Sequence, residues 1–296
     1  MYLDANCIEC LVRRESVNAL AQNDPEHAYL YMRDVLKLLL DAPEGVAAPY
    51  MIPQFNDAFA KYWGAEDRYA DIKRKSNEFM LTKLPLMRSI IAQSNDPLKM
   101  ALKFSQTGNY IDFGPLAGRV CDEELDAMLL KTPENPLDET AYRRFADQLA
   151  TAKRFVCVGD NAGEIVADVA LMEVLREQFP HLDLTYVVRG GPVLNDVTRE
   201  DAEAVGIDKL CHVMDNGTRI SGTQLAYISD ELRRTLDEAD VILSKGQANF
   251  ETMCPCDYNV YFMFLCKCTR FEKLFDVPRL TGMFLPMQTM GKVPFR

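Results

Sequence analysis

An apolar run that stops at a glycine and leads into a helical pattern constrains the fold of this chain most. Residues 155–158 are apolar, and Gly159, Asp160 and Asn161 follow them directly. From Ile165 onward apolar residues recur at spacings of one, three and four, which is typical of a helix. The pattern predicts a buried strand, a tight turn and a helix. The turn would be either an ordinary helix cap or a site for a hard cation beside the anion-binding amides of a helix N-terminus.

The second half of the chain repeats this alternation of strand and helix. Near-continuous apolar strands separated by helices predict a parallel sheet covered on both faces. If the strand order is 3-2-1-4-5, the first and fourth strands are neighbours, and a ligand binds beyond their carboxyl ends, where the order reverses. The predicted strands are residues 154–158, 183–188, 209–214, 240–244 and 259–266.

The loops that follow the first four strands carry polar residues that should meet at one edge of the sheet. Asp160, Asn161 and Asp196 offer oxygen ligands, which suit Mg²⁺ or Mn²⁺ better than a cysteine-bound zinc. Lys245 suits a phosphate oxygen, and Gly246 allows the backbone to approach it. We expect the ammonium of Lys245 to face Asp160 across the switch point. A cation, a lysine and a helix N-terminus together indicate phosphoryl transfer.

The first half of the chain shows helical and not strand periodicity. Asp24-Pro25 and Asp96-Pro97 are typical helix starts, and the segment from 131 to 139, with its two prolines, separates the two halves. We therefore expect a helical subdomain over residues 1–135 and a metal-binding α/β domain over residues 136–296. The glycine-rich stretch 108–114 is either a packed turn or a loop that reaches over the site. Further helices are expected over residues 54–63, 67–94 and 138–152.

Charge and cysteine content restrict the partners and the compartment. The net charge of −11 argues against nucleic acid or an anionic membrane as partner, and no apolar run approaches the roughly 20 residues that span a bilayer. Nine cysteines without a secretory signal indicate reduced thiols and a cytoplasmic protein. The pair Cys7 and Cys10, expected ahead of the first helix, fits buried thiols, a structural metal or a redox pair.

Two long motifs resemble the signatures of the metal-dependent damage-control phosphatases, a family formerly described as a domain of unknown function. They are Gly159-Asp160-Asn161-Ala162-Gly163-Glu164 and Lys245-Gly246-Gln247-Ala248-Asn249-Phe250-Glu251. Shorter matches occur at residues 7–10, 108–114, 195–198 and 267–268, and the CxxC is characteristic of one branch of the family. At residues 269–275 the chain departs from the family pattern of a short valine- and alanine-rich strand followed by a glycine turn.

The resemblance implies a three-layer α/β/α sandwich with a mainly parallel, Rossmann-like sheet and an added helical part. It implies a divalent cation (Mg²⁺ or Mn²⁺, with Ni²⁺ or Co²⁺ as alternatives) at Asp160, Asn161 and Asp196, and Asp160 and Lys245 as catalytic residues. The substrate would be a small phosphorylated metabolite, such as a sugar phosphate or a damaged cofactor precursor. The residues expected to contact it are Asn109, Asp112, Gly163, Glu164, Lys245, Gly246 and Gln247.

Two other functions remain open at this point. One is a carboxyl methyltransferase, an activity proposed for one branch of the same family, although no GxGxxG follows the first strand. The other is a non-catalytic metal- or nucleotide-binding module whose cysteines hold a structural metal.

Overall fold

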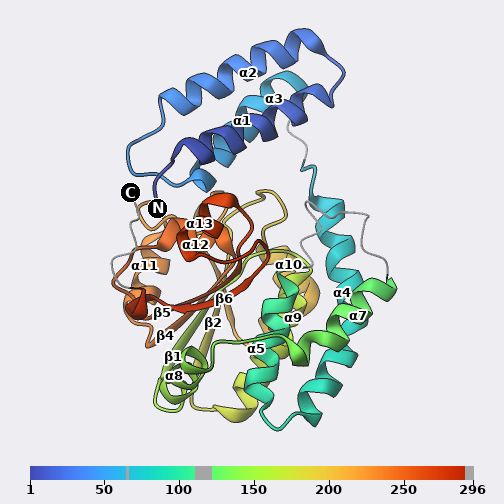
Figure 1. The fold of residues 1–296 in the computed structure, drawn as a ribbon, viewed down its shortest axis with the longest axis vertical. Helices are drawn as coiled ribbons and strands as arrows, with labels where there is room; N and C mark the ends of the chain where they lie inside the picture. Colours follow the sequence, from blue (N-terminus) through green and yellow to red (C-terminus); the bar gives the residue numbers. More distant parts are fainter. Residues whose placement is uncertain (65–66, 111–121, 291–296) are drawn as a thin grey trace.

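A six-stranded sheet forms the centre of the protein in the computed structural model, which describes residues 1–64, 67–110 and 122–290 (Figure 1). The strand order is β3-β2-β1-β4-β5-β6, and every pairing is parallel except that of β5 with β6. The predicted order of the first five strands is therefore confirmed. The strands are β1 (Arg154–Val158), β2 (Asp183–Val188), β3 (His212–Asp215), β4 (Val241–Lys245), β5 (Val260–Leu265) and β6 (Gly282–Pro286).

Alternate residues of each strand enter two separate cores, one on each face of the sheet. In β1, Phe155 and Cys157 belong to one core, whereas Val156 and Val158 belong to the other. Both faces are apolar because helices cover both, which confirms the predicted three-layer α/β/α sandwich. The first core is covered by α4 (Ala70–Gln93), α5 (Pro97–Gly108), α7 (Asp122–Lys131), α8 (Glu139–Leu149), α9 (Glu164–Gln178) and α10 (Arg199–Val205), and the second by α11 (Asp230–Asp237), α12 (Gln247–Met253) and α13 (Thr269–Phe275).

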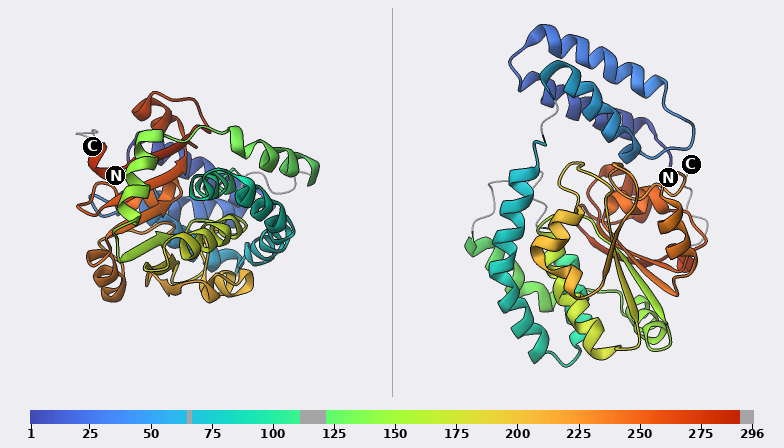
Figure 2. Two further views of the ribbon diagram at one scale, coloured as in Figure 1. Left: turned by 90° about the horizontal axis from the view of Figure 1, so that it is seen from below. Right: turned by 180° about the vertical axis from the view of Figure 1, so that it is seen from behind.

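The first three helices form a unit with a core of its own. This three-helix unit consists of α1 (Ala5–Leu20), α2 (Pro25–Leu40) and α3 (Met51–Trp63). Aromatic rings fill its interior, with Phe59 and Trp63 4.5 Å apart between ring centroids. Figures 1 and 2 show the unit at one end of the molecule, beyond the carboxyl ends of the strands and next to α12 and α13.

The hydrophobic cores group the helices differently from the expected division after residue 135. Met80 in α4, Phe104 in α5 and Leu125 in α7 share one core with the sheet, whereas the described residues of α1–α3 contribute to neither core of the sheet. The change from one core to another therefore falls close to Gly64, where α3 ends.

Several helix starts confirm the sequence signals. Asp24, Asp96 and Asp138 each precede a helix, and their side chains accept hydrogen bonds from the backbone amides of His27, Lys99 and Ala141 at 3.2, 3.0 and 2.7 Å.

The structure corrects the expectation for the N-terminal segment and shows which elements the C-terminal segment forms. Cys7 and Cys10 lie inside α1 and not ahead of the first helix. The sequence does not reveal α1 because Ile8, Val17 and Leu20 are exposed, so its apolar residues do not follow one face. Residues 269–275, where the family pattern is lost, form α13, and the chain then returns as the antiparallel edge strand β6.

Among the described residues, no helix is both long enough and apolar enough to span a membrane.

Candidate active site

The loops that follow the central strands meet at one cavity of about 330 Å³. Backbone contacts hold these loops together: Asn161 and Asp196 form an isolated antiparallel bridge, and the amide of Val197 donates to the carbonyl of Asp160 at 2.9 Å. The three-helix unit supplies the opposite wall. The loop residues that line the cavity are Asp160, Asn161, Asn195, Asp196, Ser221, Gln247 and Lys267, and the residues of the three-helix unit include Leu11, Arg14 and Ile52.

Two side-chain amides donate hydrogen bonds to one oxygen of Asp160. Its Oδ2 accepts hydrogen bonds from Nδ2 of Asn109 at 2.8 Å and from Nδ2 of Asn161 at 2.7 Å. On the other side Gly246, with φ of +83°, lies so close that a Cβ there would be 2.0 Å from Cγ of Asp160. Glycine is therefore required at this position, both for the backbone conformation and for the approach of the carboxylate.

Asp196 is held by a buried arginine. Nε of Arg189 donates to Oδ2 of Asp196 at 2.7 Å, and Oγ of Ser221 lies 3.1 Å from Oδ1. Arg189 and Asp196 are only 1% and 2% exposed, so the ion pair is shielded from solvent. The two Nη atoms of Arg189 have no hydrogen-bond partner among the described residues. Asp196 also lines the cavity together with Asp160.

Asp160 lies near other carboxylates, and a bound cation would neutralise part of this negative charge. Burial, followed by the nearby carboxylates of Glu164 and Asp196, raises the pKa of Asp160 to about 8, although Lys267 and Arg189 act in the opposite direction. Two carboxylates and one carboxamide are the oxygen donors that a hard divalent cation prefers. No three His, Cys, Asp or Glu side chains in the described part of the chain are arranged to bind a metal. The carboxamide of Asn161 would therefore complete the protein's ligand set, so the residues present fit such a cation.

Lys245 does not lie beside Asp160, and this expectation is wrong. Its ammonium is fully buried and contacts Oε1 of Glu164 and Oδ1 of Asp168, each at 2.7 Å. The reason is the two-residue period of a strand: Lys245 points to the same face as Leu243, and α9 covers that face. Oδ1 of Asp168 also accepts from Oγ of Ser105 at 2.6 Å, and its Oδ2 accepts from the hydroxyl of Tyr186 at 2.7 Å.

The residues expected to contact substrate differ in whether they line the cavity or lie behind it in the protein interior. Gln247 lines the cavity, and Gly246 packs against Asp160. Asn109 and Glu164 are each 1% exposed, and Nδ2 of Asn109 donates a hydrogen bond to Oε2 of Glu164 at 2.7 Å. These two residues therefore support Asp160 from the protein interior. The amide of Gly163 donates to Oδ1 of Asn77 at 2.7 Å, which ties the loop to α4. Asp112 lies outside the described residues.

Sequence reasoning did not assign three residues of this site. Lys267, which follows β5, lines the cavity beside Asp160, but the sequence shows it only as part of a short motif. Ser221 lies in an irregular segment without a recognisable pattern. A signal did exist for Arg189, because an arginine directly after a buried strand needs a carboxylate partner, and Asp196 follows seven residues later.

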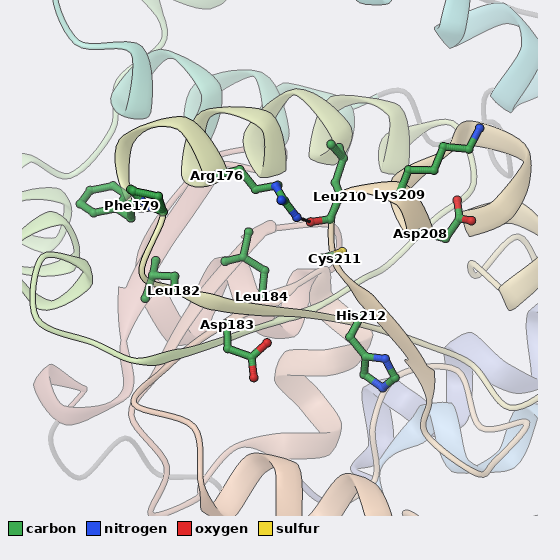
Figure 3. Close-up of a pocket in the computed structure, with 11 residues that line it drawn as sticks. Arg176, Phe179, Leu182, Asp183, Leu184, Asp208, Lys209, Leu210, Cys211 and His212 are labelled. Carbon is green, nitrogen blue, oxygen red and sulfur yellow. Dashed lines mark hydrogen bonds between the residues drawn. The ribbon is translucent and has the colours of Figure 1, made fainter.

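Another cavity, of about 310 Å³, lies at the opposite end of the strands and contains none of the expected site residues (Figure 3). It is lined by the beginnings of β2 and β3 and by the end of α9. Arg176 there donates to the carbonyl of Leu210 at 2.6 Å. Burial raises the pKa of the Cys211 thiol to about 12, so this thiol stays protonated.

Comparison with known proteins gives one consistent result. A family model described as the damage-control phosphatase ARMT1-like domain matches residues 3–280. A damage-control phosphatase of Archaeoglobus fulgidus is 30% identical over 273 residues, which are 90% of this chain and 93% of that protein. A damage-control phosphatase of Pyrococcus horikoshii is 29% identical over 221 residues, which are 74% of each chain. The crystal structure of a DUF89 family protein from Pyrococcus horikoshii superimposes with a TM-score of 0.83 at 25% identity, covering 97% of this chain and 99% of that one.

We expect Gly246→Ala to weaken metal binding about tenfold to a hundredfold, because the added methyl group would displace the Asp160 carboxylate. Gly206→Ala is the matched control: its φ is +79°, but no atom lies within 3.8 Å of the added Cβ position. Mn²⁺ affinity of both variants can be measured by calorimetry. Equal affinities in the two variants would contradict the predicted displacement of the Asp160 carboxylate.

The affinity for Mn²⁺ should rise with pH up to about 8. The pKa of Asp160 lies near 8 in the metal-free folded protein, against 3.8 for the free side chain, so a cation must displace a proton at pH 7. Below pH 8 the affinity should increase up to about tenfold per unit, and above it the affinity should level off. The same shift means that ionisation of Asp160 opposes folding of the metal-free protein as pH rises from about 4 to 8. Calorimetry in buffers of different ionisation enthalpy counts the released protons, and a count of zero at pH 7 would refute this account.

Proposed function

Because the chain belongs to the ARMT1-like damage-control phosphatase family and is thus a metal-dependent phosphatase, we propose that it hydrolyses a small sugar phosphate or damaged phosphometabolite in the cavity below the three-helix unit. The observation that supports this site most is the convergence of Asp160, Asn161 and Asp196 from two loops at the wall that also holds Lys267.

In this proposal Asp160, Asn161 and Asp196 hold Mg²⁺ or Mn²⁺, with Ni²⁺ or Co²⁺ as alternatives. Such a cation, when bound, polarises a phosphoryl oxygen and lowers the pKa of bound water. Lys267 meets the phosphate oxygens and stabilises their charge in the transition state, because it is the lysine that lines the cavity next to Asp160. Oδ2 of Asp160 is engaged by two amides, which leaves Oδ1 for the reacting groups.

We assign Lys245 a supporting role in place of direct contact with the phosphate. Its charge offsets those of Glu164 and Asp168, and Glu164 in turn accepts hydrogen bonds through Oε2 from Asn109 at 2.7 Å and from Asn161 at 3.2 Å. Lys245 therefore acts on the reaction through the position of the amides that hold Asp160.

We further place the chain in the branch of the family marked by an N-terminal CxxC, formed here by Cys7 and Cys10 in the first turns of α1. The described cysteines are all unpaired, which supports a reducing compartment such as the cytoplasm. The oxygen ligands that meet from the loops after β1 and β2, Asp160, Asn161 and Asp196, favour a phosphatase over the methyltransferase and binding-module alternatives.

Phosphate release should require a divalent cation. After dialysis against a chelator, hydrolysis of p-nitrophenyl phosphate should fall to background, and added Mn²⁺ should restore it. Asp196→Ala should lose Mn²⁺ affinity as measured by calorimetry, and Asn56→Ala, half-buried on α3 and not among the residues that line the cavity, serves as a control that keeps it. Full turnover in excess chelator would exclude a metal-dependent reaction.

Two lysine substitutions should distinguish a residue that contacts the phosphate from one that stabilises the buried charge network. Lys267→Ala should lower kcat/KM by roughly 10²–10³ with little change in the free energy of unfolding, because Lys267 is partly exposed in the cavity. Lys245→Ala should lower the free energy of unfolding by about 3–5 kcal/mol, because two buried carboxylates lose their counter-charge. Adding Asp168→Asn to Lys245→Ala should recover part of that loss. A Lys245→Ala variant as stable as the parent in chemical denaturation would contradict the role assigned to Lys245.

A further inference from the structure

The active-site cavity continues into a second cavity of about 220 Å³ under α1. The two cavities share a rim formed by Leu11, Ala48, Gln247, Glu251 and Lys267. The second cavity extends from this rim to α13 and to the chain after it, where Arg279 lies. Figure 1 shows how α1 passes close to α12 and α13 at this place. Together the two cavities have the size of a small-molecule site, about 300–1,000 Å³.

The second cavity is basic although the protein is acidic. Its charged lining consists of Arg13, Lys267, Arg270 and Arg279 against Glu9 and Glu251. The whole chain carries a net charge of −11, so a local excess of cations reverses the prevailing field. The first cavity differs, because its metal-binding end is rich in carboxylates.

The arginines of the second cavity differ in how far they are already engaged. Arg270 is held inside the protein: its Nε pairs with Asp4 at 3.0 Å, and its Nη1 donates to the carbonyl of Tyr2 at 2.8 Å. Arg13 pairs with Glu9 at 3.3 Å on the exposed face of α1, a contact of little energy in water. Arg279 is exposed and forms neither a hydrogen bond nor an ion pair with any residue that the structure describes. Arg279 is thus ready to bind an anion, with Arg13 beside the same cavity.

The cysteines that line this cavity do not indicate a metal or redox site. Cys7, Cys10 and Cys268 line it, but they form no metal-binding group among the described residues. Burial also raises the pKa of Cys7 to about 11 and raises that of Cys268, so both remain thiols at neutral pH. The basic side chains are left as the feature that a ligand would recognise.

We propose that the second cavity is an anion subsite, and that the preferred substrate carries a second anionic group, a carboxylate or a phosphate, at the end remote from the scissile phosphate. The proposal rests on the phosphatase function assigned to the first cavity. With the scissile phosphate at Asp160 and Lys267, the rest of the molecule would pass Gln247 on the shared rim, and its terminal anion would meet Arg279 and Arg13. Small phosphorylated sugar acids and bisphosphates have this chemistry, whereas neutral-tailed sugar phosphates do not.

Non-hydrolysable ligands test this directly. Alkylphosphonates of three to six carbons are titrated calorimetrically into the protein with and without Mn²⁺, either unsubstituted or with a terminal carboxylate or a second phosphonate. At the chain length that spans both cavities, the second anion should lower Kd about tenfold or more. The two kinds of terminal group show whether carboxylate or phosphate is preferred. The gain should shrink at high salt, since Arg13 and Arg279 are exposed.

Substitutions show whether the named arginines bind the second anion. Arg279→Ala combined with Arg13→Ala should bring the ratio of the two Kd values close to one, and Arg279→Glu alone should invert it. Arg143→Ala is the matched control, because Arg143 is an exposed arginine paired with a glutamate four residues away, on α8. It should leave the ratio unchanged.

The possible results separate the subsite from the phosphatase function. A ratio near one at every chain length in the parent protein would overturn the subsite, and so would a high ratio that survives both arginine substitutions. Absence of phosphate release from any ester, with the ratio still high and sensitive to Arg279, would instead overturn the phosphatase proposal and leave the subsite standing.

Discussion

Lys245 lies between Glu164 and Asp168 in the interior of the protein, and the geometry of the active site depends on this contact. Two carboxylates placed close together without solvent repel each other, and a lysine between them makes the arrangement tolerable. Glu164 can then accept hydrogen bonds from the amides of Asn109 and Asn161, which also donate to Asp160. A chain of buried polar contacts therefore runs from the end of β4 to the carboxylate that faces the cavity.

A second buried ion pair, Arg189 with Asp196, does the same for the neighbouring loop. The remaining charge is nevertheless unbalanced, since burial and the nearby carboxylates keep the pKa of Asp160 high. A divalent cation would remove this imbalance. The preference for a cation is thus a property of the whole buried charge set, and it extends well beyond the residues that would bind the metal.

The sheet and the three-helix unit contribute different properties to the site. The loops of the sheet provide the proposed metal ligands and Lys267, and they are braced by buried hydrogen bonds. The three-helix unit has its own core and provides one wall, including Leu11 and Arg14. The two parts meet at the loop after β2, because Val193 of that loop is buried in the core of the three-helix unit three residues before Asp196. The three-helix unit also lines the basic cavity under α1, so it contributes to both the proposed active site and the proposed anion subsite.

The sequence by itself determined a parallel sheet covered on both faces and the meeting of Asp160, Asn161 and Asp196 at one edge, whereas the strand order was an assumption that the structure confirms. The covered sheet and this meeting follow from local apolar periodicity and from the rule that parallel strands end at one edge. Only the tertiary structure decided which way Lys245 points, that Lys267 takes the place beside Asp160, and that α4, α5 and α7 pack with the sheet and not with α1–α3. The direction of a side chain at a strand end depends on which helix covers each face, and the state of a buried charge depends on partners such as Asp168, 77 residues away from Lys245. Local patterns contain no information about such contacts, because they form only when distant segments pack together.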